Sequence, residues 1–259
     1  MGIKLVILAF SVRIVIHRIT LFYEQSDEYS LFSHVSDHFL LLVCVLLLMA
    51  VNWLLEAIKW RVLTSDIQQL NTKESFRSVL IGLAIGLLTP RRLGEVGGRI
   101  LYLSRENRIT GMLSFGMGSL VQTAITLGMG LVDLGFSTTG IPSVLIQHTH
   151  LLVFLSAFLF FIILWMIFNL PALYQWLNHF AFFRKRQKLF GYLQNQSRTK
   201  IIFVFLLGFA RYVTFSLQFF LLIRLFGNPM DSYAVFIGIG LMYLVMTFLP
   251  ISSLLDLGV

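Results

Sequence analysis

The sequence predicts an all-α, polytopic integral membrane protein, and three properties support this fold class. Of the 259 residues, 57% are hydrophobic and 12% are charged, whereas about a quarter of the residues of a soluble domain are charged. The mean hydropathy is +0.83. The apolar residues also gather into segments of about 20 residues, the length of helix that crosses a bilayer. We therefore expect one membrane domain over residues 1–259.

About six segments are expected to be membrane helices. The weakest is Ile3–Tyr23, because Arg13 would lie near its middle. The others are almost wholly apolar: Phe39–Val62, Ile109–Phe136, Leu151–Leu170, Ile201–Phe226 and a segment that begins at Ser232. The net charge of +8 lies in short loops beside these segments, which is typical of membrane orientation and contact with anionic lipid rather than of nucleic-acid binding.

The charges of the loops predict how the segment Phe76–Leu103 is arranged. The loop Glu24–His38 carries four acids and no Lys or Arg, whereas Pro171–Lys200 carries six bases and no acid. The positive-inside rule places the basic loop in the cytoplasm and the acidic loop outside. Both ends of Phe76–Leu103 then fall on the cytoplasmic side, which predicts a re-entrant hairpin that turns near Pro90. The alternative is an ordinary crossing helix with an imperfect charge bias.

The turn of this segment is the strongest candidate for a functional site. Charge at a break in a membrane helix is costly, and it usually marks function. Arginine binds phosphate through two parallel hydrogen bonds, and glycine permits tight turns and close approach of a ligand. The motif consists of Pro90, Arg91, Arg92, Gly94, Glu95, Gly97 and Arg99. It predicts an anionic headgroup site; the alternative is a basic anchor with an ordinary Glu95–Arg99 ion pair.

Three further polar residues lie within predicted membrane helices. Glu56 shares a helix face with Lys59 and can pair with it or reach the arginines of the hairpin; the alternative is a snorkelling lysine beside an aromatic anchor. Gln122 either packs between helices or lines a cavity. Arg211 lies deep in its helix, where it should face protein or water, and its natural partner is Asp256 or Glu56. The alternative for Arg211 is a shallow helix and a snorkelling side chain.

A short internal similarity suggests an inverted repeat. Residues 75–82 resemble residues 232–238 with one gap, and each stretch leads to a proline that is followed by an acid and a glycine. In the second copy these are Pro250, Asp256 and Gly258. Three expected crossings separate the copies, so the second would be inverted, as in many secondary transporters. Because the chain stops at Val259, we expect it to be truncated within a second broken segment.

No catalytic constellation is visible in the sequence. It lacks a Gly-rich phosphate loop, a nucleophile elbow and a metalloprotease helix. Cys44 is the single cysteine, so neither an intrachain disulfide nor a cysteine-based metal cluster can form. We therefore predict no metal, no cofactor and no enzymatic activity.

Three stretches together resemble the lysylphosphatidylglycerol synthase/flippase transmembrane family, and in particular stand-alone bacterial members without the synthase domain. These are Asn52-Trp-Leu-Leu-Glu-Ala-Ile-Lys-Trp60, Thr89-Pro-Arg-Arg-Leu-Gly-Glu-Val-Gly-Gly-Arg99 and Gly118-Ser-Leu-Val-Gln122. The resemblance implies a polytopic domain with broken helices that handles lipid. It makes Pro90, Arg92, Gly94 and Glu95 the motif positions, with Gln122 facing them and Pro250 and Gly258 beginning a second element.

From the residues and this resemblance we expect a flippase-like protein of the bacterial inner membrane. Its partners would be membrane lipids, in particular an anionic phospholipid, and not nucleic acid. In this hypothesis the arginines hold the lipid phosphate while the acyl chains stay in the bilayer. Two alternatives remain: a membrane enzyme acting on a lipid-linked substrate, and a partner subunit that does not transport.

Overall fold

The computed structural model describes residues 38–87, 89, 93–136, 149–179, 191–192, 196–225 and 231–248. Every regular element in these ranges is helical. In chain order they are α3 (Phe39–Thr64), α4 (Thr72–Leu87), α5 (Leu93–Ile100), the 3₁₀ helix η2 (Arg105–Asn107), α6 (Arg108–Phe136), α8 (Thr149–Phe168), α9 (Leu170–Leu177), α12 (Arg198–Leu225) and α13 (Ser232–Phe248).

Three helices, α3, α6 and α12, are long and apolar enough to cross a membrane. A fourth span is possible if α8 and α9 are counted together, although they meet at an angle of 93°. The bend lies at Asn169 and Pro171, where proline removes a backbone donor from the helix. Helix α13 has 17 residues and is shorter than a full span. The described residues thus provide three or four spans rather than about six, and Ile3–Tyr23 lies outside them.

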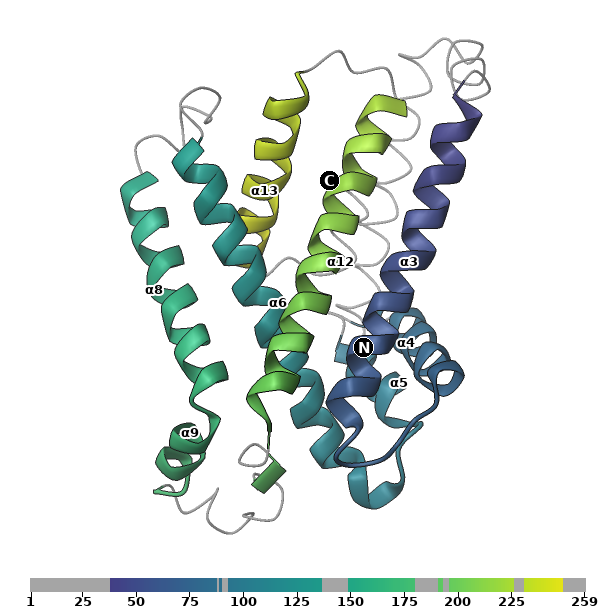
Figure 1. Ribbon diagram of the computed structural model, residues 1–259, viewed down its shortest axis with the longest axis vertical. Coiled ribbons are helices and arrows are strands. Elements are labelled where there is room, and N and C mark those ends of the chain that lie inside the picture. Colours follow the sequence, from purple (N-terminus) through teal and green to yellow (C-terminus); the bar gives the residue numbers. More distant parts are fainter. Residues whose placement is uncertain are drawn as a thin grey trace, which may run out of the picture.

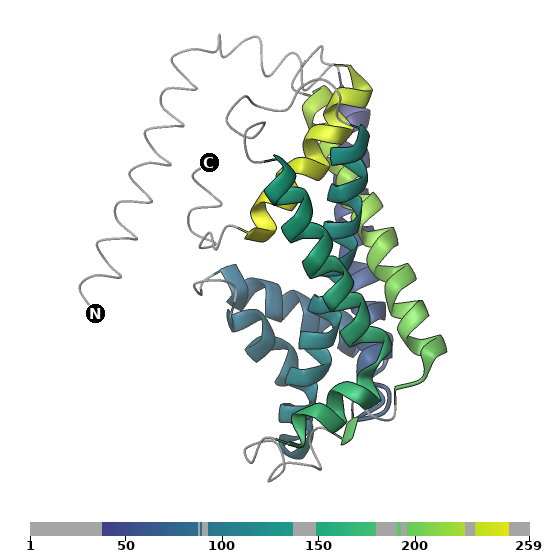
Figure 2. The same cartoon turned by 90° about the vertical axis from the view of Figure 1, so that its left-hand side faces the viewer.

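The long helices lie side by side along the longest axis of the molecule (Figure 1). Helix α12 packs along α3, α6 packs against α8 and α13, and α4 and α5 gather beside the end of α3 that contains Thr64. The view turned by 90° shows α4 and α5 projecting to one side of the long helices (Figure 2). The described residues of the chain therefore form a helical bundle with a short helical pair attached at one end.

Helices α4 and α5 form a helical hairpin rather than one continuous membrane-spanning helix. At 1.5 Å per residue, the 16 residues of α4 and the eight of α5 extend about 24 Å and about 12 Å, less than the roughly 30 Å of the hydrocarbon core. Side-chain hydrogen bonds join the residues before α4 to the residues after α5. The Gln68 amide donates to the Tyr102 carbonyl over 3.3 Å, and the Asn107 amide donates to the Ile67 carbonyl over 3.2 Å. Both ends of the hairpin therefore lie together at one end of the bundle, and the segment is not a single straight helix as the alternative requires.

Glycine allows the two arms of the hairpin to pack with their backbones almost in contact. A Cβ atom at Gly98 would lie 2.7 Å from Gly82 Cα, and one at Gly82 would lie 2.8 Å from the Glu95 carbonyl oxygen. At the turn, the Gly94 amide donates to the Thr89 hydroxyl over 2.8 Å. The backbone of α5 is thus pressed against α4, which fixes where the side chains of α5 point.

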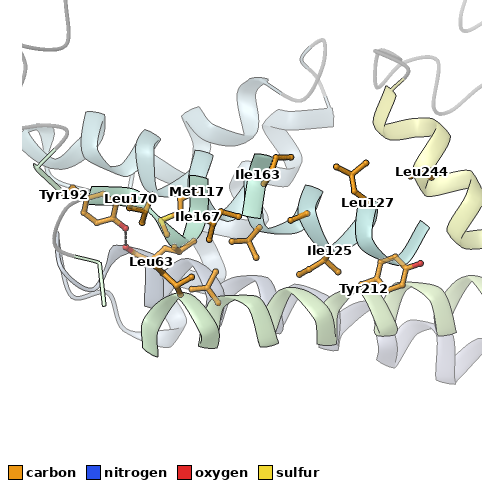
Figure 3. Close-up of a cluster of buried hydrophobic side chains, with 14 residues drawn as sticks. Leu63, Met117, Ile125, Leu127, Ile163, Ile167, Leu170, Tyr192, Tyr212 and Leu244 are labelled. Atoms are coloured by element: carbon orange, nitrogen blue, oxygen red, sulfur yellow. Dashed lines mark hydrogen bonds between the residues drawn. The ribbon is translucent and has the colours of Figure 1, made fainter. Parts of the chain in front are cut away.

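Apolar side chains from α6, α8, α12 and α13 form the main core of the bundle (Figure 3). Met117, Val121 and Leu127 of α6 are almost fully buried in it. At one end of this core, the Tyr192 hydroxyl donates to the Leu63 carbonyl over 2.6 Å (Figure 3). This core holds α6 and α12 in register, and it therefore positions the polar residues that these helices carry.

Candidate functional site

The candidate site is built around Glu56 of α3. Asn52, Glu56 and Lys59 follow one another at helical spacing on one face of α3. All three are buried, and Glu56 is only 5% exposed. A buried carboxylate needs charged or hydrogen-bonding partners to offset the loss of water, so the groups that surround Glu56 determine what the site can do.

Three cations from three helices converge on the Glu56 carboxylate. Lys59 Nζ of α3 lies 2.7 Å from Oε2, and Arg99 Nη1 of α5 lies 2.6 Å from Oε1. Arg211 of α12 reaches Oε2 through its Nη1 atom. One carboxylate thus joins the bundle helices to the hairpin.

Each arginine has further contacts that fix its orientation. Arg99 also pairs with Glu95 one helical turn away, and its guanidinium lies 5.0 Å from the centre of the Phe115 ring. Arg211 Nε donates to Asn52 Oδ1 over 2.8 Å. Arg99 is 2% exposed at its side chain, whereas Arg211 is 17% exposed. Arg211 is therefore the most accessible cation of the network.

These groups border a cavity of about 260 Å³. Gln122 of α6 lies in its wall, and the Gln122 Oε1 atom is buried without a hydrogen-bond partner in the described structure. The cavity therefore offers both cationic donors and an unused acceptor. Its lining consists of Glu56, Lys59, Leu63, Glu95, Arg99, Phe115, Gly118, Ser119, Gln122, Thr123 and Arg211.

The charges of the network do not cancel. Lys59, Arg99 and Arg211 contribute three positive charges, and Glu56 and Glu95 contribute two negative charges, which leaves a net charge of +1. Among the described residues, no other acidic or basic residue lines the cavity. An uncompensated charge in a poorly solvated place costs several kcal/mol, so the cavity favours an anion.

The structure brings together five of the predicted site residues: Glu56, Glu95, Arg99, Gln122 and Arg211. Of the two partners proposed for Arg211, the structure shows Glu56. Lys59 does not snorkel, because its ammonium group is bound to Glu56 and its side chain is 4% exposed. Gly94 and Gly97 lie within α5.

The remaining predicted residues lie outside the described residues. They are Pro90, Arg91, Arg92, Pro250, Asp256 and Gly258. The second copy of the proposed repeat begins within the described helix α13, at residues 232–238, but its proline, acid and glycine lie outside the described residues.

Some residues that line the cavity are not among the predicted site residues. Phe115 was missed because an aromatic residue in an apolar helix carries no signal of its own, and Ser119 and Thr123 were missed because small hydroxyl residues are common in such helices. The spacing of Ser119, Gln122 and Thr123 on one face of α6 is the signal that would have found them.

No group of three or more His, Cys, Asp or Glu side chains suited to a metal ion occurs in the part of the chain that the structure describes.

The comparison with protein families matches residues 5–254 to the model described as the lysylphosphatidylglycerol synthase TM region. Neither a curated protein nor a solved structure matches the chain significantly.

Proposed function

This chain belongs to the lysylphosphatidylglycerol synthase TM-region family, and from that premise we propose that it is a flippase-like protein that binds and translocates an anionic phospholipid headgroup. The observation that carries this proposal is the net charge of +1 at the cavity between α3, α5, α6 and α12. A phosphodiester carries one negative charge, and its entry would make the network neutral.

The chemistry of the cavity suits a phosphate group. A guanidinium offers paired donors that match two phosphate oxygens. Arg211 is the cation that a phosphate would meet first, because it is more exposed than Arg99 or Lys59. Arg99 is held by two carboxylates and is therefore a fixed source of positive potential beside the cavity. In this proposal the acyl chains remain in the bilayer while the headgroup passes through the cavity.

The proposal assigns no chemical step to the protein. The carboxylates that a hydrolytic or transfer reaction would need as acid and base are Glu56 and Glu95. In the structure both accept hydrogen bonds from arginine, and this arrangement favours a binding role for the network.

A translocation assay with the purified protein in liposomes tests the proposal. Phosphatidylglycerol with a fluorescent headgroup should become accessible from the opposite face faster than the matching phosphatidylcholine. Arg211→Gln should reduce the initial rate about tenfold or more, because a charge-assisted hydrogen bond contributes about 1.5–3 kcal/mol. This substitution leaves two cations and two carboxylates in the network, so the protein should still fold.

Arg105→Gln is the matched control, since Arg105 is an exposed arginine in η2 that does not line the cavity. Its rate should equal that of the unmodified protein. Translocation that is absent for every lipid would favour the non-transporting alternative. A rate that Arg211→Gln leaves unchanged would contradict the role of the cavity.

A further inference from the structure

A second hollow of about 1000 Å³ lies between α3 and α12, away from the Glu56 network. We refer to it as the interfacial groove. Its residues on α3 include Ile58, Arg61 and Val62. At 100° per residue, Arg61 projects about 140° around the helix axis from Glu56. The groove and the cavity therefore lie on different faces of α3.

The lining of the groove combines bases and neutral polar groups with apolar walls, and it contains no acid. Arg61 lies in the last turn of α3 and Lys200 in the first turn of α12, so the two bases lie where these apolar helices end and begin. The lining consists of Ile58, Arg61, Val62, Ser65, Gln69, Leu70, Asn71, Ser197, Thr199, Lys200 and Phe203.

The two bases differ in how their charges are used. Lys200 Nζ lies 2.7 Å from Asp66 Oδ2 and is therefore compensated. Arg61 is exposed, and its Nη1 atom donates to the neutral hydroxyl of Thr72 over 3.0 Å. Among the ion pairs of the described residues, none includes Arg61. The groove thus carries an uncompensated guanidinium.

Exposed apolar side chains lead from the groove towards the middle of both helices. On α3, Leu54, Val51 and Leu47 follow Arg61 at helical spacing and are 43–60% exposed. On α12, Phe203, Leu206 and Val213 are 45–60% exposed. The two helices run antiparallel, so both rows begin at the groove (Figure 1). A guanidinium above an apolar track is complementary to a phospholipid.

We infer that the interfacial groove binds a phospholipid with an anionic headgroup from the leaflet at this end of the bundle. The phosphate would pair with Arg61, and the acyl chains would lie along the apolar rows. This lipid would be separate from the transported one. Arg61 donates a hydrogen bond to Thr72, the first residue of α4. The bound lipid would therefore also stabilise the start of the hairpin.

Lipid binding to the full chain, measured by native mass spectrometry from detergent, tests this inference. Phosphatidylglycerol should bind more tightly than phosphatidylcholine, and Arg61→Gln should weaken phosphatidylglycerol binding about fivefold, as expected for one basic residue near the membrane surface. Ser65→Glu should weaken it similarly, because it adds a negative charge to an exposed position of the groove. Arg105→Gln, outside the groove, should bind the lipid as the unmodified protein does.

Three results would overturn the inference. The first is unchanged binding by both Arg61→Gln and Ser65→Glu. The second is an equal loss in Arg105→Gln, which would show a general effect of surface charge. The third is competition by soluble glycerol 3-phosphate as effective as that by the lipid, which would show a site for phosphate without acyl chains. The Arg211→Gln variant separates this inference from the proposed function, since it should lose translocation but keep the lipid in the groove.

Discussion

Arg99 and Glu56 lie 43 residues apart in the sequence, yet Arg99 Nη1 donates to Glu56 Oε1 over 2.6 Å. Arg99 lies near the end of the hairpin and Glu56 in the C-terminal half of α3. Their ion pair therefore connects a hairpin whose helices are each too short to cross a membrane to a helix that is long and apolar enough to cross one. Because Glu56 also binds Arg211 of α12, any movement of the hairpin is coupled to both long helices.

Replacing Glu56 by Gln should therefore destabilise the protein much more than replacing Glu95 by Gln. Without Glu56, Lys59 and Arg211 lose the carboxylate with which each is paired, and Arg99 keeps only Glu95. Breaking a buried ion pair costs about 3–5 kcal/mol. Without Glu95, Arg99 keeps Glu56 as its partner, so the cost should be about 1–2 kcal/mol. Unfolding of both variants in detergent, followed by circular dichroism, measures the difference. Equal losses would show that Glu56 is not the centre of the network.

A methyl group at Gly98 should loosen the hairpin, whereas one at Gly97 should not. The Cβ atom at Gly98 would lie 2.7 Å from Gly82 Cα, but at Gly97 it would meet no atom within 4 Å. Gly98→Ala should cost about 1–3 kcal/mol through overpacking. Gly97→Ala should be neutral or stabilise by up to about 1 kcal/mol, because alanine favours helix. The same unfolding measurement checks both, and a stable Gly98→Ala protein would contradict the close packing of α4 and α5.

The sequence predicted those parts of the site that depend on local spacing. Glu95 and Arg99 are one helical turn apart, so their pairing could be expected. The bond from Arg211 to Asn52 joins residues 159 positions apart, and only the packing of α12 against α3 creates it. For Arg211 the sequence left two acidic partners open, because hydropathy places a residue along a span but not around the bundle. The predicted span Leu151–Leu170 ends next to the bend at Asn169, but hydropathy does not give the angle of 93° between α8 and α9.

Cysteine labelling should place both ends of the hairpin on the cytoplasmic side. Suitable positions are Gln69 and Arg105, which are exposed, whereas Leu70 is only 4% exposed and would react poorly. In a Cys44→Ser background, Gln69→Cys and Arg105→Cys should both react with a membrane-impermeant reagent only after the cells are permeabilised, which gives the reagent access to the cytoplasmic face. Gly140→Cys, in the loop that the charge pattern assigns to the other side, should react in intact cells. Labelling of Gln69→Cys in intact cells would contradict the re-entrant arrangement.

The Gln122 side chain should lower the stability of the protein but increase the rate of headgroup translocation. Its Oε1 atom is buried without a partner in the described structure, and an unsatisfied buried acceptor costs about 1–3 kcal/mol. Gln122→Met removes this cost at similar volume, so it should stabilise the protein by about 1 kcal/mol. It should also slow headgroup translocation, because the cavity loses the acceptor that a headgroup hydroxyl or ammonium would use.

Thr126→Val provides the control for Gln122→Met. Thr126 lies one turn away on α6, does not line the cavity, and donates to the Gln122 carbonyl over 3.0 Å. Its translocation rate in liposomes should stay close to that of the unmodified protein, even if its unfolding temperature changes slightly. A Gln122→Met protein that is more stable and translocates at the original rate would show that this amide has no contact with the cargo. The donors of Lys59, Arg99 and Arg211 would then be left as the polar groups that recognise the headgroup.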